Sequence, residues 1–177
     1  MTGPSLHLPP PHPASLDESS LLAQCEIDRG RSSGPGGQNR NKVETKVTIK
    51  HLPTGLAAHA SERRSQHENR SVAIFRLRLA LAREVRTPVP IGEVRTELWR
   101  SRCGPDGLVA CNPAHQDYPT LLAFALDVIA AAGWDVKKAS LRLCCTMSQL
   151  TKLVKDEPHA WARLNHERVA RGMRTLK

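Results

Sequence analysis

The chain of 177 residues is long enough for one domain, or for one domain and a small second unit. Apolar residues make up 40% of the chain but aromatic residues only 3%, so we predict a core of aliphatic side chains. The formal net charge of +9 favours a polyanionic partner, and no apolar run approaches the ~20 residues that cross a bilayer, which argues against a membrane-spanning helix.

The charge is distributed unevenly along the chain. Basic residues outnumber acidic ones by 15 to 10 in residues 1–100 and by 10 to 3 in residues 137–177, whereas residues 101–136 hold one basic and four acidic residues. Two basic segments therefore flank an acidic one.

The five cysteines are irregularly spaced, and no signal peptide precedes them. We therefore expect free thiols and a cytoplasmic protein. Cys103, Cys111 and His115 are the best candidates for a metal site, but no C-x-x-C pair is present. We predict neither a metal nor a cofactor.

In chain order, the five prolines within residues 1–14 predict a disordered leader. A helical turn is expected at 17–24 and a strand at 25–29. Residues 45–52 alternate, with Val47, Ile49 and His51 on one face, which predicts a second strand. Residues 53–55 (Pro-Thr-Gly) form a turn, from which residues 56–59 return as an antiparallel strand.

Between the first two strands lies the sequence Arg-Ser-Ser-Gly-Pro-Gly-Gly-Gln-Asn-Arg-Asn-Lys, residues 31–42. Its glycines and proline predict an exposed loop with outward N–H groups, which could approach a phosphate backbone or stabilise a developing negative charge. On its own, this pattern fits a mobile hairpin tip equally well.

A long helix is predicted from Ser61 or Ser65 to about Val85, because Ile74, Leu77 and Leu81 recur at helical spacing. This apolar stripe would cover one face of the small sheet, giving an α+β fold. The opposite face carries Arg70, Arg76 and Arg83, which suit either a polyanion or a solvated helix surface.

The remainder predicts a linker at 87–92 followed by a helical unit at 93–177. A helix should run from Pro119 to Ala132, where Gly133 ends it. From Val136 we expect two short helices around a turn, the second starting with a capping box at Thr146–Gln149.

This helix pair has the pattern of a helix-turn-helix. The second helix would present Ser148, Gln149, Lys152 and Lys155, which suit groove or phosphate contacts, although packing alone also produces the pattern. A last helix starts near Pro158, with Trp161 and Leu164 on one side and Arg163, Arg168 and Arg171 elsewhere.

Three motifs keep their order and spacing: Gly34-Pro-Gly-Gly-Gln-Asn-Arg-Asn-Lys-Val43, Leu52-Pro-Thr-Gly55, and Glu62-Arg-Arg-Ser-Gln-His-Glu-Asn-Arg70. Over about residues 24–85 the chain thereby resembles the catalytic domain of class I peptide chain release factors and the stand-alone ribosome-rescue factors of the YaeJ type. The resemblance implies that residues 15–86 are the catalytic domain. It also implies ribosome-dependent hydrolysis of the ester between a nascent peptide and tRNA in the peptidyl-transferase centre.

The resemblance also implies roles for single residues. Gly36, Gly37 and Gln38 would be catalytic, with the Gln38 N–H as an oxyanion donor and its side chain selecting water, and Gln38 would be N-methylated by a glutamine methyltransferase. Arg64 and Gln66 match residues that seat the loop on ribosomal RNA. The full set of predicted RNA-binding residues is Arg31, Ser33, Arg40, Asn41, Lys42, Arg64, Gln66, Lys152 and Lys155.

The sequence places no catalytic triad, paired carboxylate or metal-ligand cluster near the loop, so a self-sufficient hydrolase is not expected. His51, His59 and His67 are interpreted as structural or solvated. Only about 30 residues precede the loop, so we expect no codon-reading domain. The leading hypothesis is a codon-independent, ribosome-dependent peptidyl-tRNA hydrolase that rescues stalled ribosomes or large subunits. The alternative is a non-catalytic RNA- or DNA-binding regulator that uses the basic C-terminal helices.

Overall fold

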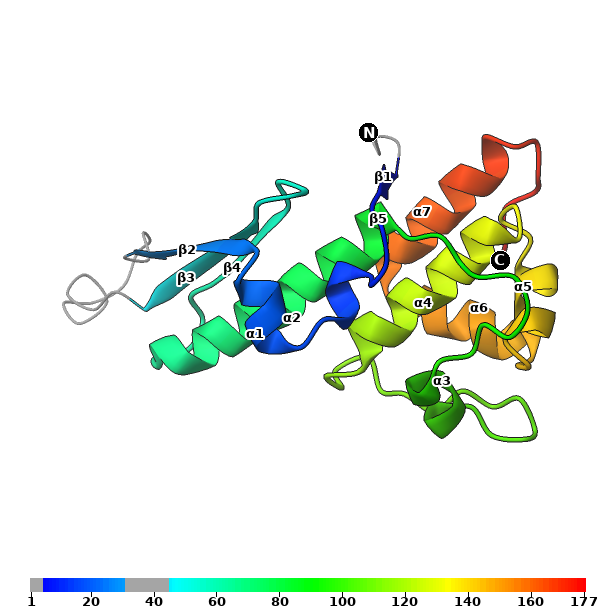
Figure 1. Ribbon diagram of the computed structural model, residues 1–177, viewed down its shortest axis with the longest axis horizontal. Helices are drawn as coiled ribbons and strands as arrows, with labels where there is room; N and C mark the ends of the chain where they lie inside the picture. Colours follow the sequence, from blue (N-terminus) through cyan, green and yellow to red (C-terminus); the bar gives the residue numbers. More distant parts are fainter. Residues whose placement is uncertain (1–4, 31–44) are drawn as a thin grey trace. The chain divides into compact units, whose positions relative to one another are not determined.

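The computed structural model describes residues 5–30 and 45–177 (Figure 1). It combines a small antiparallel sheet, one long helix and a set of C-terminal helices, which confirms the predicted α+β class. The chain divides into two compact units. Unit 1 contains residues 1–12 and 82–177, and unit 2 contains residues 13–81.

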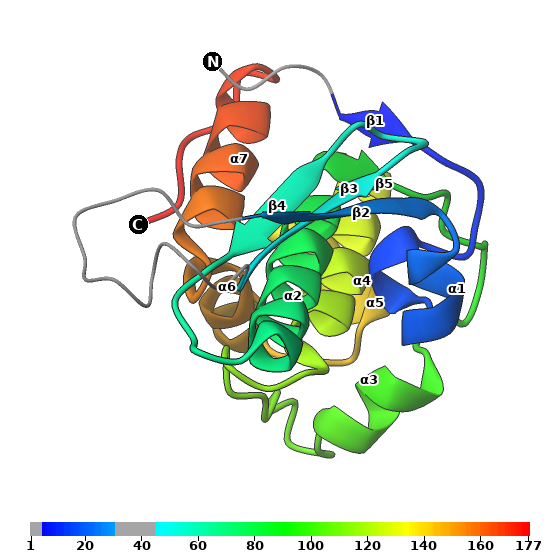
Figure 2. The same ribbon diagram turned by 90° about the vertical axis from the view of Figure 1, so that its left-hand side faces the viewer.

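Unit 2 holds a three-stranded sheet along one side of a long helix (Figure 2). The order of the strands is β2-β3-β4, and both pairings are antiparallel. Its elements are the 3₁₀ turn η1 (Pro13–Ser15), α1 (Glu18–Leu22), β2 (Cys25–Gly30), β3 (Lys46–His51), β4 (Ala57–Ala60) and most of α2 (Gln66–Glu84).

The local patterns explain these elements. The alternating residues Val47, Ile49 and His51 of β3, which were predicted to share one face, are all buried. Gly55 has φ +71, a conformation that glycine adopts without strain, and its amide donates to the His51 carbonyl at 2.8 Å to close the turn into β4. In α2, Ile74, Leu77 and Leu81 are buried and supply the helix side of the core.

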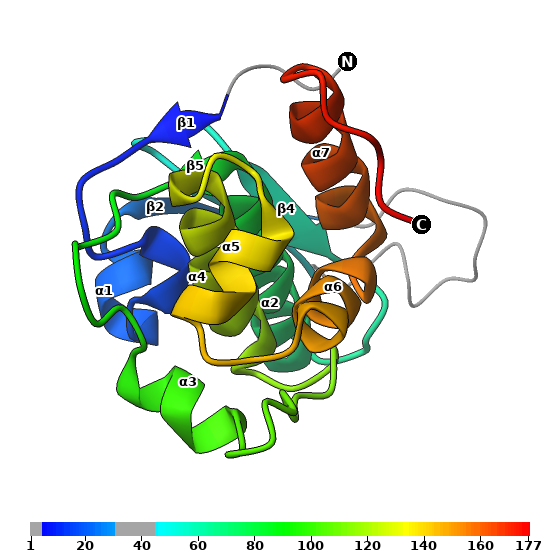
Figure 3. The same cartoon turned by 90° about the vertical axis from the view of Figure 1, so that its right-hand side faces the viewer.

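Unit 1 is mainly helical. Helix α4 contacts α5 and α6, and the chain continues through α5, α6 and α7 with each helix touching the next (Figure 3). The elements of the unit are β1 (Leu6–His7), β5 (Val85–Arg86), α3 (Glu97–Arg102), α4 (Tyr118–Ala131), α5 (Val136–Arg142), α6 (Met147–Lys155) and α7 (Pro158–Val169).

The boundaries of α4, α5 and α6 follow from their end residues. Proline occupies the first turn of α4, and Gly133 with φ +69 follows its end. Asp135 caps α5 and Thr146 caps α6 through hydrogen bonds from the amides of the first turn. Only the threonine half of the predicted capping box is present, because the Thr146 amide donates to the Gly107 carbonyl instead, at 3.2 Å.

The amino-terminal segment departs from the expected disordered leader within the described residues 5–14. Leu6 and His7 form β1, which pairs in parallel with Val85 and Arg86 of β5, and the His12 ring lies 3.2 Å from the Val85 carbonyl. A two-residue strand has no local signature, and its partner lies far along the chain. The proline-rich composition therefore concealed this pairing.

Arg163, which the sequence places away from the side of Trp161 and Leu164, lies in the core of unit 1. It is buried, forms ion pairs with Glu84 at 3.2 Å and Glu167 at 3.3 Å, and donates to the Ser5 hydroxyl at 2.9 Å. An arginine is buried when it finds such partners, and two of these three are distant in the sequence.

Two further observations concern the cysteines and the helices. All five cysteines are unpaired. Within residues 5–30 and 45–177 no single helix is long and apolar enough to cross a membrane. Helices α4 and α5 meet that requirement only in combination, across a bend of 116°.

Candidate functional site

The predicted catalytic residues Gly36, Gly37 and Gln38 lie outside the described residues, as does the predicted modification at Gln38. The predicted RNA-binding residues Arg31, Ser33, Arg40, Asn41 and Lys42 also fall within the segment 31–44. The structure describes where the chain enters and leaves this segment, at Gly30 and Thr45.

The two ends of the loop meet at one point of the sheet. The β2–β3 ladder runs in register from Cys25 opposite His51 to Gly30 opposite Lys46. Cα atoms of antiparallel partners lie about 5 Å apart, so the chain leaves β2 and re-enters β3 at adjacent positions. The segment between Gly30 and Lys46 therefore connects two adjacent positions at the end of the ladder.

A buried asparagine of α2 fixes Thr45, the residue that follows the segment 31–44. The side-chain amide of Asn69, which has no exposed surface, donates to the Thr45 carbonyl at 2.7 Å and to the Arg63 carbonyl at 2.9 Å. Its oxygen accepts from the Arg63 amide at 2.9 Å. The residue after the loop is thus tied to the segment that precedes α2.

The segment between β4 and α2 is also fixed by a second residue of α2, Arg76. Arg76 donates to the His59 carbonyl at 2.8 Å and forms an ion pair with Glu62 at 2.6 Å. Hydrogen bonding from Arg76, assisted by nearby backbone amides, lowers the pKa of Glu62 to about 2. Arg76 therefore joins the end of β4 to the helix rather than remaining a merely solvated side chain.

Arg64 and Gln66 lie at the start of α2, as predicted. Arg64 is exposed and Gln66, the first residue of the helix, is half-buried. The Ser65 hydroxyl accepts from the Glu68 amide at 3.4 Å, so Ser65 rather than Ser61 caps this end. An exposed arginine beside a helix amino terminus is suited to a phosphate, because both present positive charge.

Lys152 and Lys155 belong to α6 in unit 1, and both are exposed. Lys155 lies over the Trp161 ring, with its Nζ 5.7 Å from the centroid. Ser148 is exposed on the same helix, while Gln149 is half-buried. Three of the four residues predicted on this helix surface are thus exposed in unit 1.

The histidines of unit 2 have the structural or solvated roles that the sequence predicts. His51 is fully buried, with Nδ1 2.8 Å from the Thr54 hydroxyl and Nε2 3.1 Å from the Gln24 side-chain oxygen. Burial lowers the pKa of His51, which favours a neutral ring that holds the turn. His59 and His67 are exposed.

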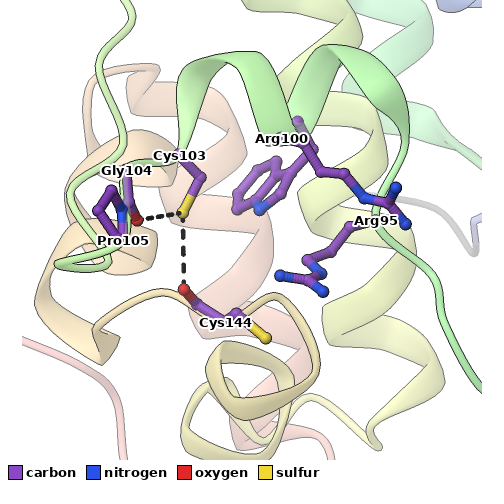
Figure 4. Close-up of a pocket in the computed structure, with 7 residues that line it drawn as sticks. Arg95, Arg100, Cys103, Gly104, Pro105 and Cys144 are labelled. Carbon is purple, nitrogen blue, oxygen red and sulfur yellow. Dashed lines mark hydrogen bonds between the residues drawn. The ribbon is translucent and has the colours of Figure 1, made fainter.

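Unit 1 contains a small pocket of about 220 Å³ (Figure 4). It is lined by Arg95, Trp99, Arg100, Cys103, Gly104, Pro105 and Cys144. Arg95 and Arg100 both pair with Glu93, and the Cys103 thiol donates to the Cys144 carbonyl at 3.6 Å. Burial raises the pKa of Cys103, which disfavours a reactive thiolate. We assign no catalytic role to this pocket.

Asn69 is a buried contact of Thr45 and Arg63 to which sequence reasoning assigned no role. It lies within the motif at 62–70, but the motif alone indicates no role for its amide. A signal was available, because asparagine is unfavourable inside a helix unless its side chain has a backbone partner. At four residues after the capping Ser65, it falls on the inward side of the first turns of α2.

The sheet, the long helix and the fixed positions of Gly30 and Thr45 define unit 2 as an α+β domain in which the glycine-rich segment 31–44 joins two paired strands. Residues 20–96 match the RF-1 domain family. This part of the chain is therefore similar to the catalytic domain of class I peptide chain release factors.

Curated relatives match the same region. The chain is 43% identical over 80 residues to peptide chain release factor 1 of Xylella fastidiosa (strain 9a5c), covering 45% of this chain and 22% of that protein. It is 42% identical over 82 residues to peptide chain release factor 1 of Acidiphilium cryptum (strain JF-5), covering 46% and 23%. Peptide chain release factor PrfB1, chloroplastic, of Arabidopsis thaliana is 41% identical over 81 residues, with 45% and 18% covered. The match thus spans about a fifth of the length of these relatives.

Proposed function

We propose that this protein hydrolyses the ester of peptidyl-tRNA on the ribosome, independently of a codon, and so rescues stalled ribosomes or large subunits. The observation that carries the proposal is the Gly36-Gly37-Gln38 tripeptide within a stretch that matches the RF-1 domain. The proposal places the protein in the cytoplasm, with ribosomal RNA and peptidyl-tRNA as partners.

The proposed chemistry needs few groups from the protein. An ester is already activated, and the terminal ribose of tRNA and the ribosomal RNA can relay protons. The loop would place a water, and the Gln38 N–H would stabilise the tetrahedral intermediate, a contribution of about 3 kcal/mol for one such donor. Gly36 and Gly37 would allow the backbone to approach closely, and the Gln38 side chain would admit water in preference to larger nucleophiles. N-methylation of Gln38 by a glutamine methyltransferase is part of this proposal.

The described stem supports the proposal in physical terms. A loop that enters a narrow site needs a rigid base, and the chain leaves and re-enters the sheet at paired residues, Gly30 and Lys46. Asn69 fixes the exit at Thr45, and Arg64 and Gln66 lie on the segment that the same amide holds. The contacts that would seat the loop on ribosomal RNA are thus tied to the stem by hydrogen bonds.

Unit 1 would supply a second anchor on RNA. Residues 137–177 contain ten basic and three acidic residues, and Lys152 and Lys155 are exposed on α6. Exposed lysines bind phosphates without reading sequence, and each contact makes affinity depend on salt. This surface also supports the second candidate, a non-catalytic RNA- or DNA-binding regulator, because α5 and α6 form a capped helix pair joined by a short turn.

One experiment separates these candidates. Labelled peptidyl-tRNA is prepared on ribosomes whose mRNA ends in the P site, on ribosomes with a stop codon in the A site, and on isolated large subunits. The proposal predicts release from the first or the third complex without any requirement for a stop codon. Release only at a stop codon would contradict codon independence, and binding without release from all three would favour the regulator.

A further inference from the structure

Asn69 uses its whole side-chain amide on backbone groups of two different segments. Both donor bonds, to Thr45 at 2.7 Å and to Arg63 at 2.9 Å, come from Nδ2, and Oδ1 accepts the Arg63 amide at 2.9 Å. The residue has no exposed surface. These three bonds are called the Asn69 clamp.

The two segments that the clamp joins have different proposed tasks. Thr45 follows the glycine-rich loop and precedes Lys46, the first residue of β3. Arg63 is held at both its amide and its carbonyl, which fixes the backbone from which the exposed Arg63 and Arg64 side chains project. The clamp therefore connects the loop exit directly to a pair of exposed arginines.

Packing alone does not explain an asparagine here. A buried polar side chain costs free energy unless its groups are bonded, and an apolar residue would fill the same space without that requirement. Aspartate has nearly the same shape but supplies no donor, so it would face the Thr45 and Arg63 carbonyls with a negative charge. Two donors and an acceptor on one short side chain are specific to asparagine.

We propose that Asn69 is a positioning residue that couples phosphate binding by Arg63 and Arg64 to the position of Thr45, the residue that follows the segment 31–44. The inference rests on the proposed function and identifies the partner of this surface as the phosphate backbone of ribosomal RNA. When the two arginines bind phosphates, the clamp transmits their position to Thr45 and thus to the loop. Without the clamp, the arginines and Thr45 are held independently.

The test is a double-mutant cycle in the full chain with Asn69→Asp and Arg64→Gln. Leu77→Ala is the matched control, because Leu77 is a fully buried residue of the same helix that takes no part in the clamp. Each variant is assayed for ribosome affinity and for the rate of peptide release at saturating protein, at a temperature where circular dichroism shows it folded. If Asn69→Asp does not fold, Asn69→Ser, which retains one hydroxyl donor, replaces it.

Asn69→Asp should lower the saturated release rate by about ten- to a hundredfold, because a displacement of about 1 Å has effects of this size. Arg64→Gln should weaken ribosome binding severalfold in the wild-type background and much less in the Asn69→Asp background. Leu77→Ala should preserve both the saturated rate and the effect of Arg64→Gln.

An unchanged release rate in folded Asn69→Asp, together with an equal effect of Arg64→Gln in both backgrounds, would overturn the inference and leave Asn69 a structural residue. Failure of the proposed function looks different, because the wild-type chain itself would then release no peptide. The binding half of the cycle would still measure whether Asn69 and Arg64 are coupled.

Discussion

Replacing Asp127 by asparagine should destabilise unit 1 strongly. The Asp127 carboxylate accepts from the Arg86 guanidinium at 3.1 Å, from the Thr87 amide at 3.2 Å and from the Thr87 hydroxyl at 2.5 Å. Both charged side chains are almost fully buried, at 3% and 4% exposure. Asparagine keeps the shape and one acceptor but removes the negative charge, so the Arg86 cation remains buried without its counter-ion.

The magnitude follows from this burial. Burial lowers the pKa of Arg86 to about 10, and Asp127 opposes this shift, so the guanidinium is charged beside its buried counter-ion. Breaking a buried ion pair by removal of one partner costs about 3–5 kcal/mol. Two backbone carbonyls, those of Ala82 and Arg83, continue to accept from Arg86, so we expect the free energy of unfolding to fall by about 3 kcal/mol.

Urea unfolding followed by tryptophan fluorescence measures this loss, because all three tryptophans lie in unit 1. Glu93→Gln, which breaks an exposed pair with Arg95 in the same unit, is the control and should change the midpoint little. The double variant Arg86→Met with Asp127→Leu should recover most of the stability, since an apolar pair can replace a buried ion pair. If Asp127→Asn stays within about 1 kcal/mol of the wild type, the ion pair does not stabilise unit 1 as argued.

Two further predictions concern acid stability and salt. Burial, and to a lesser extent the charge of Arg86, lower the pKa of His12 from 6.5 to about 4. His12 therefore leaves the free energy of unfolding of unit 1 unchanged above pH 6.5. Between pH 6.5 and about 4 that free energy should fall by up to about 3 kcal/mol, because only the unfolded chain is protonated there. Urea unfolding across this range measures the loss, and His12→Asn should flatten the curve. Replacing both Lys152 and Lys155 by glutamine should reduce the slope of log affinity against log salt for ribosome binding by about 0.7–0.9 for each phosphate that the variant no longer binds. An unchanged slope would mean that α6 does not touch RNA.

Much of the fold could be predicted because its signals are local. The alternation of Val47, Ile49 and His51 gave β3 and its buried face, and the stripe of Ile74, Leu77 and Leu81 gave α2. Turn and capping residues gave most of the boundaries. Each of these signals lies within one element, and short-range periodicity is sufficient to predict it.

The parts that could not be predicted depend on partners distant in the sequence. Strand β1 exists because Leu6 pairs with Val85, and Arg163 is buried because Glu84 and Ser5 lie beside it. Nothing in the proline-rich leader or in the last helix indicates these partners. Two-residue strands and buried arginines are products of tertiary structure rather than of local sequence.

The candidate site shows the same division. The tripeptide Gly36-Gly37-Gln38 and the motif residues Arg64 and Gln66 could be identified from sequence, since their spacing carries the resemblance. The contacts of Asn69 follow only from the structure, in which its three bonds join residues 24 and 6 positions away. Motifs indicate which residues belong to a site, whereas hydrogen bonds indicate how they are held.

The most direct measurement of the central claim compares Gln38→Ala and Gln38→Pro with the wild type in peptide release from ribosomes, at saturating protein. The account predicts that the alanine variant keeps part of the activity, because its main-chain N–H remains. The proline variant should lose release while still binding ribosomes, because proline has no N–H to stabilise the oxyanion. Equal loss of release in both variants, with binding preserved in both, would contradict the account by showing that the side chain of Gln38 carries catalysis.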